Sequence, residues 1–417
     1  MRILKTTQTY YPYLNKGGPP AKVRAIAKAL VKRGHEVTVL TALHREQEAG
    51  AGGSGLEAAE FTRCAWGWET KDEGVRAIYL RTLQNYRATT INPQLLSFCA
   101  RRLREFDVVH VYGLYDLIGS MTAWFCRRRG IPYVLEPLGM FGPKVRSRQK
   151  KRLYSKLVGE ALFSGARAIV ATSETERAEL IDGSVPPEKI VLRRNGIELA
   201  EFEKLPPRGS LRARLKLSDT TPLILFLGRI SFIKGLDLLV EAFARLPEAL
   251  HGAHLAIAGP DDADGCTEVI AQSVAQLQIG ERVTMIGPLY GNGRLQAFVD
   301  ADVLVLPSRY ESFGNVAAES IACGTPALVT DQCGIAPLVK DRAGLVVAAD
   351  VEGLKNGMAR LLSDDALLAG LRSGCAAVAQ GLSWDEPVAA MESLYASMIS
   401  TSAVKIRQPA TASSVRL

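Results

Sequence analysis

Two basic residues follow one predicted strand and could together bind a diphosphate. The apolar run 223–227 is typical of a buried strand, and Gly228-Arg229 comes directly after it. Lys234-Gly235 follows shortly afterwards and opens a helical pattern. A helix N-terminus favours anions, and an arginine adds a planar bidentate donor to the point charge of a lysine. Taken alone, these residues fit either a diphosphate site or two solvated surface cations.

Two glutamates follow a second predicted strand, 303–306. Glu311 is expected in the loop after that strand, and Glu319 is expected in the next helix. A carboxylate among apolar helix neighbours is costly unless hydrogen-bond donors reach it, and the hydroxyls of a ribose would do so. The alternative is that Glu319 faces solvent or pairs with a nearby arginine. The stretch between the glutamates can offer backbone amides to a ligand through Phe313, Gly314 and Asn315.

Gly17-Gly18 after the first predicted strand, 2–7, is a weaker signal. Pro19 and Pro20 come next and open a helix, where proline is favoured in the first turn. The two glycines would let backbone amides approach an anion. The spacing is not the glycine fingerprint of dinucleotide-binding folds, and an ordinary turn would look the same.

Short β-branched runs alternate with amphipathic helical stretches, which predicts an α/β protein with doubly wound parallel sheets. Strands are expected at 2–7, 36–40, 75–80, 107–111, 133–136, 168–171, 190–193, 223–227, 254–258, 282–285, 303–306, 327–330 and 345–347. The alternation pauses near 204–210, so we expect two domains, 1–205 and 206–383. A helix is expected at 384–402, followed by a disordered tail at 403–417. Two such domains facing one another would form a central ligand cleft.

The composition is typical of a globular protein, with 47% hydrophobic and 23% charged residues. No apolar run approaches the roughly 20 residues that span a bilayer, and the N-terminus does not resemble a secretory signal. We therefore expect a cytoplasmic location. The seven cysteines form no Cys-x-x-Cys pair, which predicts reduced thiols, and the five histidines form no metal-binding pattern. No metal and no nucleic-acid partner are expected.

The net charge of +8 comes mainly from basic clusters in the first half of the chain. Two of them, at 101–104 and 127–129, are interpreted as solvated helix faces. The third fits a solvated face, an anionic membrane surface or a diphosphate-bearing acceptor. Its residues include Lys144, Arg146, Arg148, Lys150, Lys151 and Arg152. If this segment contacts an anionic membrane, the protein would lie peripherally at the inner face of that membrane.

Together these motifs resemble the family 4 retaining glycosyltransferases. The resemblance extends to Asn195-Gly196-Ile197 before the linker and to Ala301-Asp302 before the strand 303–306, and it covers about residues 1–400. It implies a GT-B fold, with the donor bound mainly by the C-terminal domain and the acceptor mainly by the N-terminal one. It also implies that the helix 384–402 packs back on the N-terminal domain.

The resemblance implies a role for each motif residue. Arg229 and Lys234 would bind the diphosphate of a nucleotide-sugar donor and stabilise its departure, without a metal or another cofactor. Glu311 and the amides of Phe313, Gly314 and Asn315 would hold the donor sugar. Glu319 would bind the ribose, and Gly17 and Gly18 would cover the phosphates from the other domain. The acceptor would be a glycan or a lipid-linked molecule, and the anomeric configuration would be retained.

Two positions depart from the family pattern. Many relatives carry His-x-His at the end of the fourth strand, whereas this chain has His110 and Tyr112 there. Tyr112 could still bond to a sugar hydroxyl, and His110 fits a core residue as well as a ligand. Relatives often show Gly-Gly-x-x-Glu where this chain has Cys333-Gly334-Ile335-Ala336-Pro337. The missing glutamate leaves the donor contacts there open.

We therefore expect a hexosyltransferase of cell-surface polysaccharide or glycolipid assembly. The alternatives are a GT-B nucleotide-sugar epimerase and a non-catalytic nucleotide-sugar-binding protein. The scarcity of histidines near the predicted loops disfavours the epimerase.

Overall fold

The computed structural model describes residues 1–13, 18–44, 61–86, 89–141 and 159–407. These residues form two compact units, and each is considered by itself. Unit 1 comprises residues 1–171, 177–193 and 384–417, and unit 2 comprises residues 172–176 and 194–383.

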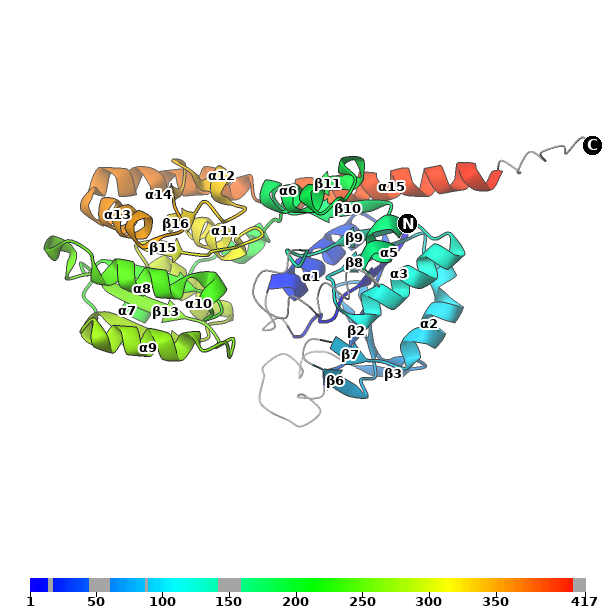
Figure 1. The fold of residues 1–417 in the computed structure, drawn as a ribbon, viewed down its shortest axis with the longest axis horizontal. Helices are drawn as coiled ribbons and strands as arrows, with labels where there is room; N and C mark the ends of the chain where they lie inside the picture. Colours follow the sequence, from blue (N-terminus) through cyan, green and yellow to red (C-terminus); the bar gives the residue numbers. More distant parts are fainter. Residues whose placement is uncertain (14–17, 45–60, 87–88, 142–158, 408–417) are drawn as a thin grey trace, which may run out of the picture. The chain divides into compact units, whose positions relative to one another are not determined.

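Unit 1 is built, in its described residues, on a nine-stranded sheet with the order β11-β10-β9-β8-β1-β2-β5-β4-β3 (Figure 1). Neighbouring strands are parallel except at β3–β4 and β4–β5, which are antiparallel. The strands are β1 (Arg2–Thr6), β2 (Glu36–Ala42), β3 (Thr62–Cys64), β4 (Gly67–Asp72), β5 (Val75–Leu80), β8 (Val108–Tyr112), β9 (Tyr133–Glu136), β10 (Ala168–Ala171) and β11 (Ile190–Leu192). A separate hairpin consists of β6 (Gln84–Tyr86) and β7 (Thr89–Ile91).

Helices cover both faces of this sheet because its central strands are buried on both sides. Apolar side chains of α1 and α15 share one core with Ile3 and Val108, and those of α2, α3 and α5 share another with Leu4 and Val109. The helices are α1 (Gly18–Lys32), α2 (Gln94–Arg102), α3 (Leu117–Arg129), α5 (Glu160–Gly165), α6 (Glu174–Asp182), which begins in residues of unit 2, and α15 (Asp385–Arg407).

Unit 2 contains, in its described residues, a six-stranded parallel sheet with the order β14-β13-β12-β15-β16-β17. Its strands are β12 (Leu223–Leu227), β13 (His254–Ala258), β14 (Val283–Gly287), β15 (Val303–Leu306), β16 (Ala327–Thr330) and β17 (Gly344–Val347). Its helices are α7 (Ser210–Arg214), α8 (Leu236–Ala244), α9 (Cys266–Gln276), α10 (Gly291–Asp300), α11 (Asn315–Ala322), α12 (Ala336–Val339), α13 (Val351–Ser363) and α14 (Asp365–Gln380).

The strand β12 shows why this sheet is apolar on both faces. All five of its residues are buried, and alternate side chains point to opposite sides. Leu225 packs with α10, α11 and α14, whereas Phe226 packs with α8, α9 and α13. The sequence LILFL is therefore the continuous apolar run that a central parallel strand requires.

The boundary between the units differs from the predicted one at 205/206. Residues 194–205 are grouped with unit 2. The backbone N–H of Ile197 donates to the carbonyl oxygen of Leu382 at 2.7 Å, and Phe202 packs in the core of unit 2. Because this pairing joins segments far apart in the sequence, the composition of the linker region gave no sign of it.

The C-terminal segment also differs from the prediction. Helix α15 ends at Arg407, so 403–407 is helical rather than a disordered tail, while 408–417 lies outside the described residues. Pro387 lies in the first turn of the helix, where proline is tolerated, and no other proline or glycine occurs before Pro409. Residues 384–417 are grouped with unit 1, where α15 packs against α1 and β8. Within the described part of the chain, no helix is both long and apolar enough to cross a membrane.

A buried polar cluster joins α1, β8, β9 and α15 in unit 1. The carboxylate of Glu136 accepts from Lys22 Nζ at 2.7 Å and from Arg193 Nη2 at 2.6 Å. His110 Nδ1 lies 2.6 Å from the hydroxyl of Tyr395 and its ring is fully buried. Burial would raise the pKa of Glu136, but the two cations outweigh it and hold that pKa well below its usual value. The cluster therefore keeps a carboxylate ionised inside the unit.

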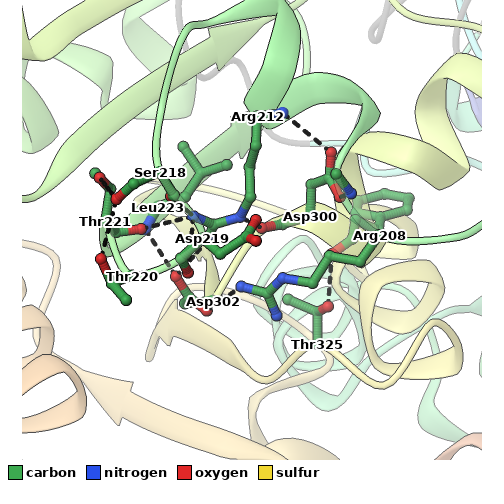
Figure 2. A network of polar contacts seen from close by, with 12 residues as sticks. Arg208, Arg212, Ser218, Asp219, Thr220, Thr221, Leu223, Asp300, Asp302 and Thr325 are labelled. Carbon is green, nitrogen blue, oxygen red and sulfur yellow. Dashed lines mark hydrogen bonds and ion pairs between the residues drawn. The ribbon is translucent and has the colours of Figure 1, made fainter.

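A second polar network fixes the start of β15 beside the start of β12 in unit 2. Figure 2 shows Arg208 and Arg212 converging on Asp302, and Arg212 is only 1% exposed. Asp302 accepts from the backbone N–H of Leu223 at 2.9 Å, and its own N–H donates to the Leu223 carbonyl oxygen at 2.8 Å. Both guanidinium groups lie 2.8 Å from its carboxylate, as does that of Arg372. One side chain thus holds the two strands in register.

Replacing Asp302 with asparagine should lower the free energy of unfolding by about 3 kcal/mol, because it leaves the buried charge of Arg212 without its carboxylate. Urea unfolding followed by circular dichroism measures the change. Asp219→Asn is the matched control, since Asp219 is exposed and contacts Arg212 only through its backbone carbonyl. An Asp302→Asn variant as stable as this control would contradict the role given to the network.

The burial of His110 should make stability fall as the pH falls. Burial lowers the pKa of His110 to about 3, although Glu136 opposes the shift. The unfolded chain takes up a proton near its ordinary pKa of about 6.5, so between these values the unfolded state binds one proton more. Stability is therefore lost at up to about 1.4 kcal/mol per pH unit as the pH drops below 6.5.

His110→Gln should remove this part of the pH dependence. Glutamine can still bond to Tyr395 but does not titrate. Urea unfolding at several pH values between about 7 and about 4.5 gives the slope of the free energy of unfolding against pH for each variant. His251→Gln, at an exposed histidine of unit 2, should keep the wild-type slope. Equal slopes for wild type and His110→Gln would show that His110 does not contribute.

Candidate active site

The predicted donor residues follow two neighbouring strands of unit 2. β12 pairs with β15 in parallel, with Ile224 opposite Val303. After β12 the chain continues to β13 and β14 on one side, whereas β15, β16 and β17 lie on the other. The loops after β12 and β15 therefore leave the sheet at the point where the strand order reverses, and ligands of open α/β sheets bind there.

The loop after β12 carries Arg229 and Lys234. Lys234 ends a 3₁₀ turn, η7 (Phe232–Lys234), and Gly235, with a positive φ of 69°, is the N-cap of α8. A Cβ atom on Gly235 would lie 2.0 Å from the carbonyl oxygen of Pro307, in the loop after β15. Only glycine allows the two loops to approach so closely. Their backbones are in contact, which brings their side chains together.

Arg229 and Lys234 both form ion pairs in this structure. Arg229 Nη1 lies 2.7 Å from Asp262 Oδ1, and its side chain is 52% exposed. Lys234 Nζ donates to the carboxylate of Glu311, with both side chains less than one-fifth exposed. The structure therefore brings Lys234 and Glu311 together, whereas Arg229 projects further into solvent.

The loop from Glu311 to α11 is held by backbone hydrogen bonds to the loop after β16. The N–H of Gly334 donates to the carbonyl oxygen of Glu311 at 2.9 Å, and that of Ile335 to Phe313 at 2.7 Å. Phe313 is 1% exposed and packs in the core, so a ligand could reach only its backbone. Gly314 has a φ of 111°, which a residue with a side chain would adopt only at a cost.

Helix α11 begins at Asn315, directly after this loop. The first N–H groups of a helix have no partner within the helix, and its dipole makes that end favourable for anions. The side chain of Asn315 accepts from Asn195 Nδ2 at 3.0 Å. Asn195 was not among the predicted site residues, although it belongs to the Asn-Gly-Ile element.

Glu319 is paired with an arginine, as in the alternative kept open above. Glu319 Oε2 lies 2.9 Å from Arg294 Nη1, and the two side chains are 18% and 25% exposed. Burial raises the pKa of Glu319, while Arg294 opposes that shift. No sequence signal singled out Arg294, because the partner of a helix glutamate depends on how α10 and α11 pack.

The described site residues predicted in unit 1 lie in different surroundings. Gly18 is exposed and begins α1, whereas Gly17 lies outside the described residues. His110 and Tyr112 are 0% and 1% exposed, and Tyr112 accepts a hydrogen bond of 2.7 Å from Lys5 Nζ. They lie on the face of β8 that packs against α15, so this structure offers neither side chain to a substrate.

Cys333, at the second departure from the family pattern, is buried. Burial raises the pKa of its thiol to about 12, which leaves it protonated and unreactive. A pocket of about 350 Å³ opens beside it. Its lining includes Ser173, Arg194, Asp331, Gly334, Pro337 and Lys340.

The geometry of unit 2 favours one kind of ligand. A helix N-terminus and two cations suit a diphosphate, and two carboxylates, one in the loop before α11 and one within that helix, suit hydroxyl groups. The loops meet at the edge where α/β sheets bind nucleotides. A molecule with a diphosphate flanked by two hydroxyl-bearing groups matches this arrangement.

Two family models match the chain. Residues 17–196 match the glycosyl transferase 4-like domain, and residues 207–375 match glycosyl transferases group 1. A D-inositol 3-phosphate glycosyltransferase of Xylanimonas cellulosilytica is 27% identical over 406 residues, which is 91% of each chain. A D-inositol 3-phosphate glycosyltransferase 1 of Catenulispora acidiphila is 31% identical over 74% of this chain and 77% of its own.

Solved structures share the fold. Sucrose-phosphate synthase from Thermosynechococcus elongatus has a TM-score of 0.72 at 23% identity, over 96% of this chain and 99% of its own. Anabaena HepE in complex with UDP and glucose has a TM-score of 0.74 at 18% identity, over 95% of this chain and 100% of its own. These matches confirm the predicted GT-B fold. The chain therefore belongs to the group 1 glycosyltransferases of family 4.

Proposed function

We propose that this glycosyltransferase moves a hexosyl group from a nucleotide-diphosphate sugar to a glycan or lipid-linked acceptor, with retention of configuration and without a metal ion. The observation that best supports the proposal is the contact of Lys234 with Glu311 beside the start of α11. A cation, a carboxylate and free helix amides at one strand edge match the phosphate and sugar parts of such a donor.

In the proposed reaction, the bond between the sugar's anomeric carbon and the diphosphate oxygen breaks. The acceptor oxygen forms a new bond to that carbon on the same face, and its proton passes to the departing phosphate oxygen. Negative charge grows on the diphosphate as it leaves, and fixed cations that face this charge lower the barrier. Lys234 and Arg229 have this role in the proposal.

Donor binding requires an exchange of partners. Lys234 is paired with Glu311 and Arg229 with Asp262 in this structure. The Arg229–Asp262 pair is exposed, so its rearrangement around a diphosphate costs little. Lys234 is less exposed, and in the proposal the diphosphate replaces Glu311 as its anionic partner. Once Lys234 faces the phosphates, Glu311 becomes free to accept from hydroxyls of the donor sugar.

An epimerase of the same fold is the second candidate, since it would bind the same donor. It would convert the nucleotide sugar when no acceptor is present, whereas a transferase would leave the sugar configuration unchanged. Chromatography of the nucleotide sugar after incubation separates the two. HepE was solved with UDP and glucose, so the first nucleotide sugars to test are those of UDP, followed by GDP and ADP.

Lys234→Ala should reduce transfer by roughly 10²–10³-fold, because one fixed charge on the departing diphosphate is lost. The measurements are release of nucleoside diphosphate from the nucleotide sugar that best protects the wild type against thermal unfolding, and circular dichroism to show that the variant is folded.

Lys355→Ala is the matched control, because Lys355 pairs with Glu352 within α13 and has no contact with the loops after β12 or β15. Near-normal turnover by Lys234→Ala would refute the diphosphate role. A wild type that no nucleoside diphosphate or nucleotide sugar protects would overturn the proposed function as a whole.

We also propose that unit 1 contacts an anionic membrane surface from the cytoplasmic side. The basic segment 144–152 lies outside the described residues and remains a prediction. Support comes from α3, where the exposed Leu117 and Trp124 share one helix face with Arg128. The guanidinium of Arg128 lies 4.5 Å from the Trp124 ring. Tryptophan beside arginine suits the boundary between headgroups and acyl chains.

The double variant Trp124→Ala, Arg128→Ala should bind vesicles about tenfold or more weakly than the wild type, since one basic residue near an anionic surface contributes about 1 kcal/mol and the ring adds apolar area. Cosedimentation with phosphatidylcholine vesicles containing phosphatidylglycerol measures the affinity. Vesicles of phosphatidylcholine alone should retain little protein.

Trp68→Ala with Arg63→Ala is the matched control for this surface. These residues are also exposed in unit 1 and lie opposite one another in the β3–β4 pair. The control should bind like the wild type. Equal loss in both double variants, or no loss in either, would contradict docking through α3.

A further inference from the structure

Arg294 is the charged partner of Glu319 that the motifs did not include. It lies on α10, and Phe298 of the same helix packs in one core with Ala318 and Ile321 of α11. This packing holds the two helices against each other. The position of the Arg294 guanidinium relative to the Glu319 carboxylate is therefore set by the core and not by a flexible surface.

The contact between Arg294 and Glu319 leaves room for a ligand. The closest approach of the two side chains joins Oε2 of Glu319 to Arg294 Nη1, at 2.9 Å. The Glu319 side chain keeps 18% of its surface exposed, so a ligand can still reach the carboxylate. A largely buried carboxylate is costly unless hydrogen-bond donors reach it, and a ligand hydroxyl would add one to the guanidinium.

A second carboxylate also approaches Arg294. The exposed Glu201 Oε2 lies 3.4 Å from Arg294 Nη2. Glu201 belongs to η6 (Leu199–Phe202), whose Phe202 is anchored in the core of unit 2. With a carboxylate on two of its nitrogens, the guanidinium has few alternative positions, and this limits the rotation of the Glu319 carboxylate as well.

We propose that Arg294 is a positioning residue for nucleotide recognition, which holds Oε2 of Glu319 and thereby presents Oε1 to a ribose hydroxyl. The proposal rests on the proposed function, since it assumes that a nucleoside diphosphate binds beside α11. In this arrangement a hydroxyl donates to an ionised carboxylate whose direction is fixed before the ligand arrives, so little ordering is needed on binding.

Arg294→Gln should weaken binding of the ribose and not of the diphosphate. The probes are the nucleoside diphosphate that binds the wild type and its 2′-deoxy and 3′-deoxy counterparts, measured by calorimetry. A hydrogen bond to a charged group makes the wild type prefer the ribose form over one of the deoxy forms by about tenfold or more. In Arg294→Gln this preference should fall to about threefold or less, because the carboxylate is no longer held in its direction.

The conservative variant and a matched arginine separate positioning from a purely structural role. Arg294→Lys keeps a cation near Oε2 and should restore part of the preference. Arg372→Gln removes an arginine–aspartate pair of 2.8 Å elsewhere in unit 2 and should leave the preference at the wild-type value. A structural defect would weaken ribose and deoxyribose forms equally and leave their ratio unchanged.

The outcomes distinguish this proposal from the proposed function. A wild type that binds no nucleoside diphosphate refutes the function itself. A wild type that binds but does not prefer ribose, or an Arg294→Gln variant with the wild-type preference, overturns the role of Arg294 alone. Glu319→Gln should lose the preference like Arg294→Gln, and the double variant should lose no more than either single variant.

Discussion

The parallel pairing of β12 with β15 is the constraint on which the candidate site depends. Both strands are buried and run in the same direction, so the loops that follow them must leave at one edge of the sheet. Asp302 holds the beginnings of these strands together through the backbone of Leu223 and through the buried Arg212. At the other end, Gly235 touches the backbone at Pro307. Lys234 and Glu311, 77 residues apart, meet as a consequence.

The charged groups of this site have protein partners even without a ligand. Arg229 and Lys234 are paired with aspartate and glutamate, and Glu319 with Arg294. The Arg229–Asp262 pair lies near the surface and can exchange partners at little cost. The Lys234–Glu311 and Arg294–Glu319 pairs are each at most one-quarter exposed, so each carboxylate needs a charged or hydrogen-bonding partner at all times.

Unit 1 uses its polar residues in another way. His110 and Tyr112 lie where relatives of the family carry two histidines, yet here they stack on each other, 4.0 Å between ring centroids, inside the unit. Tyr395 from α15 bonds to His110, and Lys5 from β1 donates to Tyr112. In this structure the two side chains connect the sheet with the C-terminal helix.

Sequence alone predicted two doubly wound parallel sheets, since alternating apolar runs and helical stretches leave few other arrangements, but it missed the antiparallel strands β3 and β4 of unit 1. It singled out Arg229, Lys234, Glu311 and Glu319 as candidate donor residues from their order after strands. It could not determine which charges meet. Arg294 and Asn195 were missed, the unit boundary was expected at 205/206 rather than at 193/194, and whether His110 is a core residue or a ligand was left open. Each of these depends on contacts between segments distant in sequence. Local patterns fix which face of an element is apolar, but only the packing of α10 on α11, or of α15 on β8, decides which polar side chain lies against which partner.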